Sequence, residues 1–137
     1  KARHMIRDCK LIAEKNNISF KFNSYFPIKS LNLMRGVLVV VEDNFKSYYI
    51  DSIYNAIWQD GLNLNDENIF QKILKNLNIN PKTFLLRLAS SSIKDSLKKK
   101  TSEAYEKGIF GAPSFVINNK IFWGQDRIEF VLSEAKK

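Results

Sequence analysis

Apolar residues recur at helical spacing along most of the first hundred positions of the chain. The apolar faces consist of Met5, Cys9, Ile12 and Ala13; Met34, Val37, Leu38 and Val41; Phe45, Tyr49, Ile53 and Ile57; Ile69, Ile73 and Leu77; and Phe84, Leu88, Ile93 and Leu97. Members of each set are mostly three or four residues apart, which predicts amphipathic helices. We therefore expect a largely helical region over residues 1–107.

Capping residues mark the expected helix boundaries, although two stretches have alternative interpretations. Good N-caps are Ser30, Asp43–Asn44, Asp66 and Asn80, and good C-terminal residues are Gly61 and Gly108. Three serines at 90–92 are expected to bend or break the last long helix. The valines of residues 37–41 also permit a buried strand, and residues 18–22 alternate as a short strand or an extended connector does.

The last thirty residues have a different pattern. Apolar runs flank Asn118–Asn119, and both Asn residues tolerate the left-handed conformation of a two-residue turn, so the pattern predicts a β-hairpin. Pro113 marks the first residue of a strand or an edge. Its peptide bond is either trans or cis, and the cis form would turn the main chain of Ala112 outward to bind an extended peptide. Since two strands are not stable alone, we expect that a front half of the sheet is missing from this sequence.

Composition and charge exclude several classes of function. The 137 residues carry a formal net charge of +8, but the lysines are scattered and Lys98–Lys100 occupies one helical turn without interleaved aromatic residues. We therefore expect no nucleic-acid site, whereas the charge suits an anionic small-molecule substrate. No run is long enough to span a membrane. Cys9 is the single cysteine and His4 the single histidine, so we expect a cytoplasmic protein without a disulfide or a metal site.

Gln125–Asp126–Arg127 lies between the hairpin and a final helix. In one interpretation, Asp126 is simply an N-cap and Gln125 a loop amide. In the other, the free N–H groups of the helix N-terminus bind the carboxylate of a small peptide. The pattern alone leaves both open.

Several stretches resemble one known family. The run 107–131 contains FGAPSFV and FWGQDR, residues 1–8 are followed by Ala13-Glu14-Lys15, and Phe26–Leu31 is followed by Arg35. Together they resemble the 2-hydroxychromene-2-carboxylate isomerase and kappa-class glutathione transferase family. The resemblance implies an α/β thioredoxin-like fold of the disulfide-oxidoreductase type with a large helical insert. Residues 1–107 would form the insert, and residues 108–137 the C-terminal β-β-α half. The N-terminal β-α-β half, with its catalytic serine in a Ser-Pro-Tyr motif, is expected to be absent.

The resemblance also implies roles for particular residues. Glutathione would be the cofactor, held by the main chain of Ala112 beside a cis Pro113, by Gln125 and Asp126 at the γ-glutamyl end, and by Lys1 at the glycine end. Trp123 and Phe26 would line the substrate pocket, although core packing is the simpler explanation for both aromatic residues. Family members are usually homodimers.

The function expected from the resemblance is a glutathione-dependent isomerase that acts on intermediates of aromatic degradation by thiolate addition and elimination. Three alternatives stay open: a kappa-like glutathione transferase, a thiol-disulfide oxidoreductase of the same fold, and a non-catalytic binding module. An oxidoreductase needs a Cys-x-x-Cys pair, which this sequence lacks.

Overall fold

The computed structural model describes residues 2–41 and 45–137. It divides into two compact units, Lys1–Lys94 (unit 1) and Asp95–Lys137 (unit 2), and each is described by itself. The division falls inside a helix, whereas the sequence predicted a boundary after residue 107. The expected cap at Asp43–Asn44 lies outside the described residues.

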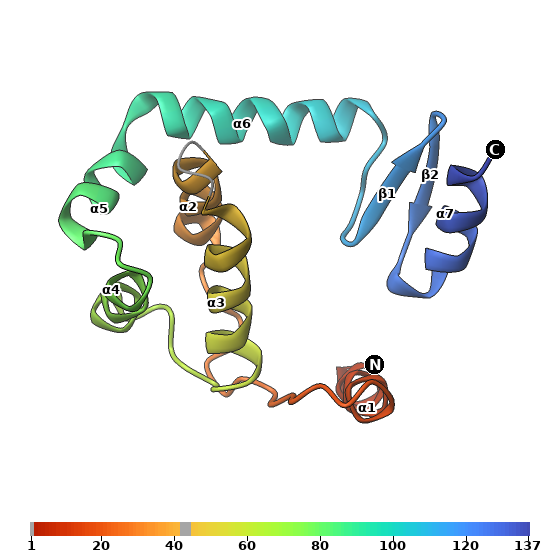
Figure 1. Ribbon diagram of the computed structural model, residues 1–137, viewed down its shortest axis with the longest axis horizontal. Coiled ribbons are helices and arrows are strands. Elements are labelled where there is room, and N and C mark those ends of the chain that lie inside the picture. The colour runs from red at the N-terminus through yellow and green to blue at the C-terminus, as the bar shows by residue number, and fades with distance from the viewer. Residues whose placement is uncertain (1, 42–44) are drawn as a thin grey trace. The chain divides into compact units, whose positions relative to one another are not determined.

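Unit 1 is helical. Its helices are α1 (Ala2–Lys15), α2 (Leu31–Val41), α3 (Lys46–Trp58), α4 (Glu67–Asn76), α5 (Pro81–Ala89) and the first turn of α6 (Ser91–Glu106) (Figure 1). Helix α2 packs against α3 and α5, and α4 packs against α5. Large side chains of this core include Leu33, Tyr49, Ile53, Phe70, Leu74, Phe84 and Leu88.

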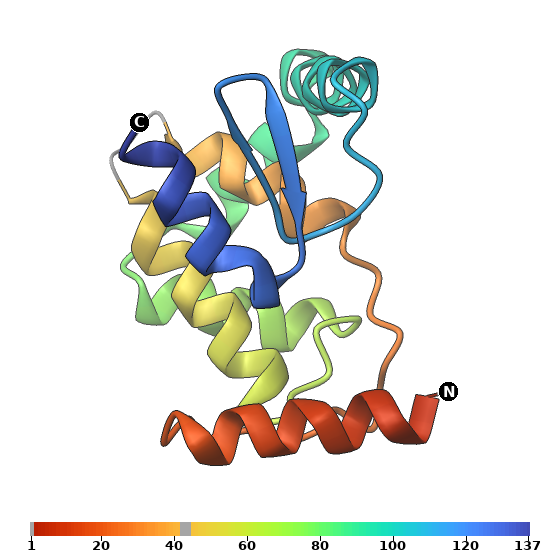
Figure 2. The ribbon, with the colours of Figure 1, turned by 90° about the vertical axis from the view of Figure 1, so that its right-hand side faces the viewer.

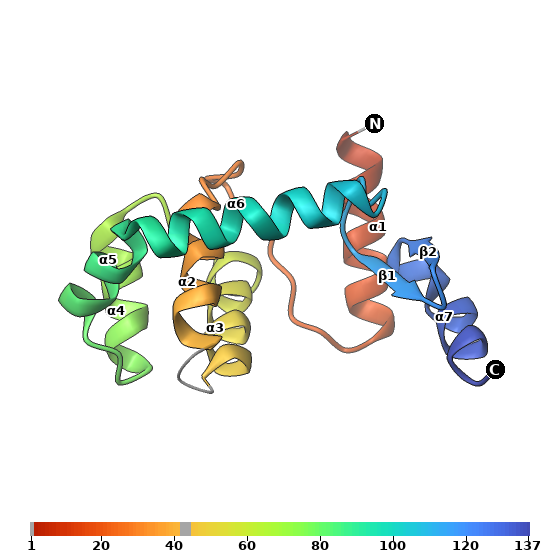
Figure 3. The same ribbon diagram turned by 90° about the horizontal axis from the view of Figure 1, so that it is seen from above.

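The local signals of the sequence placed most helix ends correctly. Asp66 accepts a hydrogen bond from the N–H of Asn68, and Asn80 accepts one from the N–H of Thr83. The serine stretch breaks the predicted helix: α5 ends at Ala89 and α6 begins at Ser91 (Figure 3). Residues 37–41 are helical, and residues 18–22 form an extended connector rather than a strand.

Several residues of the predicted apolar faces proved to be exposed, among them Met5, Ile12 and Phe45. Met34 on α2 is 49% exposed, because the core side of that helix is formed by Leu33, Gly36 and Val40 instead. Cys9 on α1 is also exposed. The spacing of apolar residues correctly predicted both helices, but only part of each predicted face is buried: Ala13 on α1, and Val37 and Leu38, which pack against the core, on α2.

Gly36 allows α2 and α3 to approach closely. A Cβ atom at this position would collide with the hydroxyl of Tyr49 and lie 3.1 Å from the ring of Phe84. The Tyr49 hydroxyl donates a hydrogen bond of 3.1 Å to the carbonyl of Leu33, and burial raises the pKa of this phenol. The core of unit 1 thus depends on the absence of a side chain at Gly36.

We predict that Gly36→Ala lowers the free energy of unfolding by about 1–3 kcal/mol, since overpacking outweighs the higher helix propensity of alanine. Urea denaturation measures the change. Ser47→Ala, on the exposed side of α3, is the control and is expected to have little effect. Because the clash involves the Tyr49 hydroxyl, Gly36→Ala should cost less in a Tyr49→Phe background. An equal cost in both backgrounds would contradict this explanation.

Candidate functional site

Unit 2 consists of the rest of α6, a hairpin and a final helix. Strands β1 (Ser114–Ile117) and β2 (Lys120–Trp123) pair antiparallel, with Ile117 opposite Lys120 at the turn. Asn118 and Asn119 have φ angles of +49° and +61°, so the two-residue turn predicted from the sequence is confirmed. A short 3-10 helix, η1 (Gln125–Arg127), leads into α7 (Ile128–Ala135), which lies along the hairpin (Figure 2).

Among the described residues, the outer edge of β1 is not paired with another strand. The N–H of Gly124 donates to the carbonyl of Pro113 over 3.0 Å, which continues the ladder beyond the last strand pair. Because bonded and outward-facing residues alternate in an antiparallel ladder, Ser114 and Val116 direct their main-chain groups away from β2. Ala112 immediately precedes this edge, and the Ala112–Pro113 peptide bond is cis.

The junction between β2 and α7 places a charged pair at a helix N-terminus. Gly124 has a φ angle of +106°, and a Cβ atom there would collide with a carboxylate oxygen of Asp126. The carboxylate of Asp126 forms an ion pair of 2.7 Å with Arg127, and both side chains are at least half exposed. Asp126 is not the N-cap of α7: that position is Arg127, without a side-chain capping bond. The carboxylate is therefore held by Arg127 and stays open to solvent.

An exposed aromatic pair lies close to these groups. The rings of Phe110 and Trp123 are 5.2 Å apart, and Trp123 is 53% exposed. Gly111 provides the space for the indole, since a Cβ atom there would come within 2.7 Å of the Trp123 ring nitrogen. The expectation that Trp123 is merely a core residue does not hold within unit 2.

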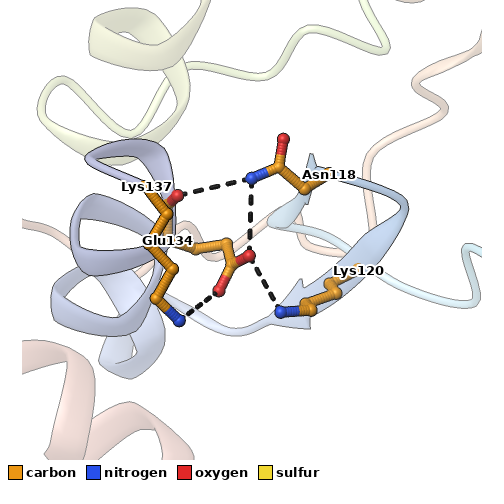
Figure 4. Close-up of polar contacts among 4 residues, drawn as sticks. All are labelled: Asn118, Lys120, Glu134 and Lys137. Atoms are coloured by element: carbon orange, nitrogen blue, oxygen red, sulfur yellow. Dashed lines mark hydrogen bonds and ion pairs between the residues drawn. The ribbon is translucent and has the colours of Figure 1, made fainter.

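Glu134 on α7 joins the helix to the hairpin, a role that the sequence did not reveal. Its carboxylate accepts hydrogen bonds from Lys120 (2.8 Å), Lys137 (3.0 Å) and Asn118 (3.4 Å) (Figure 4). Only 7% of the residue is exposed. Lys120 above all, and then Lys137, lower the pKa of Glu134 from 4.5 to about 2. The glutamate thus stays charged and attaches the C-terminal end of α7 to the hairpin.

Four of the predicted glutathione-binding residues are brought together in unit 2. The Gly124–Pro113 hydrogen bond places the Ala112–Pro113 segment beside the junction that contains Gln125 and Asp126. Phe26 belongs to unit 1, where it joins an aromatic cluster, so it is described apart from Trp123. Lys1 lies outside the described residues.

Residues 2–41 and 45–137 contain neither a candidate membrane span nor a candidate metal cluster. None of the helices there is long and apolar enough to cross a membrane. Nor do the His, Cys, Asp and Glu side chains of this part of the chain form a group of three or more that could hold a metal ion.

Comparison with known proteins assigns the family. Residues 1–136 match the DSBA-like thioredoxin domain. The chain belongs to the family of DSBA-like thioredoxin domains. Within this family, it is similar to a protein named 2-hydroxychromene-2-carboxylate isomerase from Sphingobium xenophagum, with 24% identity over 97% of this chain. A protein of the same name from Pseudomonas putida is 26% identical over 64% of this chain.

A solved structure titled 2-hydroxychromene-2-carboxylate isomerase has the same fold. It matches 98% of this DSBA-like chain with a TM-score of 0.87 at 20% sequence identity. This DSBA-like chain spans 67% of the Sphingobium protein, 42% of the Pseudomonas putida protein and 66% of the solved structure. The α/β thioredoxin-like fold expected from the sequence is therefore confirmed.

We predict that the stability of unit 2 falls at acidic pH, because Glu134 becomes protonated there. Because its pKa is lower in the folded state, this contribution is fully present above pH 4.5 and is lost as the pH falls toward about 2. Glu134→Gln should therefore destabilise the protein at neutral pH, and its difference from the unaltered chain should shrink below pH 4.5. Denaturant unfolding followed by Trp123 fluorescence, with Trp58→Phe in both proteins, measures this.

The control for this experiment is Glu129→Gln, an exposed residue of the same helix. It removes the same charge and should leave the pH dependence of unfolding unchanged. A Glu134→Gln difference that stays constant between pH 7 and about pH 2 would exclude the carboxylate as the titrating group.

Proposed function

We propose that this chain forms part of a glutathione-dependent isomerase of the 2-hydroxychromene-2-carboxylate isomerase type, acting on small anionic intermediates of aromatic degradation. Unit 2 is its proposed glutathione-binding part. The observation that supports this most is the hydrogen bond between Gly124 and Pro113, because it sets an open strand edge next to a helix N-terminus. Peptides dock on the first feature and carboxylates on the second.

The γ-glutamyl end of glutathione carries both an ammonium and a carboxylate, and the junction offers a partner for each. Asp126 is the proposed partner of the ammonium. Its ion pair with Arg127 uses one carboxylate oxygen, Oδ2, while Oδ1 lies beside Gly124. The amide of Gln125 and the first N–H groups of η1 and α7 are the proposed partners of the carboxylate.

The rest of the tripeptide would extend along the edge of β1. The main chain of Ala112 is the proposed partner of the cysteinyl residue, as in an added strand. Lys1 is the proposed partner of the glycine carboxylate. Trp123 and Phe26 are proposed to contact the substrate. A homodimer and a cytoplasmic location are implied by the same resemblance and stay predictions.

When bound, glutathione would supply the thiol that adds reversibly to the conjugated acid and loosens the bond about which the substrate rotates. The residues of this chain would hold and orient the tripeptide so that its cysteinyl residue lies at the strand edge. The Ser-Pro-Tyr motif whose serine stabilises the thiolate in the family is not among the 137 residues, so we assign no catalytic residue to this chain.

We predict that glutathione, titrated into the 137-residue chain, shifts the backbone amide resonances of Ala112, Gln125 and Asp126 in NMR spectra. Asp126→Asn should weaken this binding about tenfold or more, because a charge-assisted hydrogen bond to the ammonium is lost. Asp51→Asn, an exposed carboxylate of unit 1, removes the same charge and is expected to leave the affinity unchanged. Equal affinity for all three proteins, or shifts confined to unit 1, would refute the proposed site.

A further inference from the structure

Unit 1 contains an apolar pocket that the proposed glutathione site does not use. It has a volume of about 430 Å³ and lies between α1, the extended connector and the end of α3. Its walls are Met5, Ile6, Cys9, Phe20, Phe22, Phe26 and Trp58. This volume falls in the range typical of small-molecule sites, roughly 300–1,000 Å³.

Four aromatic rings form one wall of the pocket. Phe20 is stacked on Trp58 with ring centres 6.1 Å apart and planes 20° from parallel. Phe22 and Phe26 are tilted against the same indole at 6.2 Å and 5.8 Å. Stacked and tilted rings at these distances are the arrangements in which aromatic groups attract one another. A planar ring that enters the pocket can be held in the same way.

Hydrogen bonds hold this wall in place without a ligand. The N–H of Lys21 donates to the carbonyl of Trp58 over 2.6 Å. Asn23, which is 1% exposed, donates to the carbonyls of Ile57 and Leu62. Since side chains alternate along an extended segment, Phe20 and Phe22 lie on one side of it while Lys21 points to the other. The pocket is therefore formed before any ligand binds.

The walls contain no charged side chain. None of the seven lining residues is a carboxylate, a base or an amide, so a carboxylate placed inside would lose its hydration without gaining a charged partner. At the same time, Met5 and Phe26 are each at least half exposed. Covering this surface with an apolar ring would be favourable.

We infer that this pocket is a binding site for an uncharged, planar aromatic ring system of one or two fused rings. The site does not depend on glutathione.

The single cysteine of the sequence provides the test, since Cys9 lines the pocket and is exposed to reagents. The probe is 2-naphthol, a neutral two-ring compound. We expect it to slow the alkylation of Cys9 by iodoacetamide several-fold in the 137-residue chain, as followed by intact mass. Calorimetry should give one site per chain. The anion 2-naphthoate presents the same rings with a charge, and we expect it to bind about tenfold more weakly.

A pair of matched variants on α1 locates the site. Ile6→Trp fills the pocket and should abolish the protection of Cys9, whereas Leu11→Trp, at an exposed position outside the lining, should preserve it. The ratio of alkylation rates with and without 2-naphthol is compared within each protein, so a change in the intrinsic reactivity of the thiol cancels. Circular dichroism confirms that both variants are folded.

The inference is overturned if 2-naphthol fails to protect Cys9 or protects both tryptophan variants alike. Equal binding of 2-naphthoate would overturn the preference for an uncharged ring. These results are independent of the glutathione titration. Loss of ring binding leaves the unit 2 site untouched, and absence of glutathione binding leaves the ring site standing.

Discussion

The attachment of α7 to the hairpin through Glu134 is the contact on which the candidate site of unit 2 depends. Two strands alone are not stable in water, and the strands of unit 2 have four residues each. The glutamate accepts hydrogen bonds from the turn, from β2 and from the chain end. Because these partners come from three different places, one carboxylate fixes the C-terminal end of α7 against the hairpin. The Gln125–Arg127 junction immediately precedes the same helix.

In unit 1, the buried neutral side chain of Asn23 has a comparable structural role. The connector between α1 and α2 is neither helix nor strand, and the side chain of Asn23 attaches it by donating to the carbonyls of Ile57 and Leu62. The buried amide bonds two carbonyls from the end of α3 and the turn beyond it, as well as the N–H of Tyr25, so its own polar atoms are satisfied. The phenylalanines on either side of Asn23 are thereby held against Trp58. In each unit, one buried polar side chain fixes the segment that carries the candidate binding residues.

The features that the sequence predicted well are those decided by neighbouring residues. The Asn118–Asn119 turn, the caps at Asp66 and Asn80 and the helix break at residues 90–92 each depend on the conformational preferences of a few consecutive residues. The proximity of Ala112–Pro113 to Gln125–Asp126 can also be predicted from the sequence, because a two-residue turn determines which residues of a hairpin lie opposite each other. The resemblance to a known family supplied the roles proposed for these residues.

What the sequence by itself determined about this protein was its set of helices, its hairpin and its membership of a thioredoxin-like family. The spacing also identified the buried faces of α3, α4 and α5, but only the tertiary structure decided which side chains of α1 and α2 are buried. Gly36 shows why: periodicity places apolar residues around a helix, but the side that becomes the core depends on a close approach to Tyr49. The charged cluster of Glu134 and the aromatic pocket at Trp58 have the same origin. Their residues are separated by up to 53 positions in the chain, and packing between distant segments leaves no local pattern in the sequence.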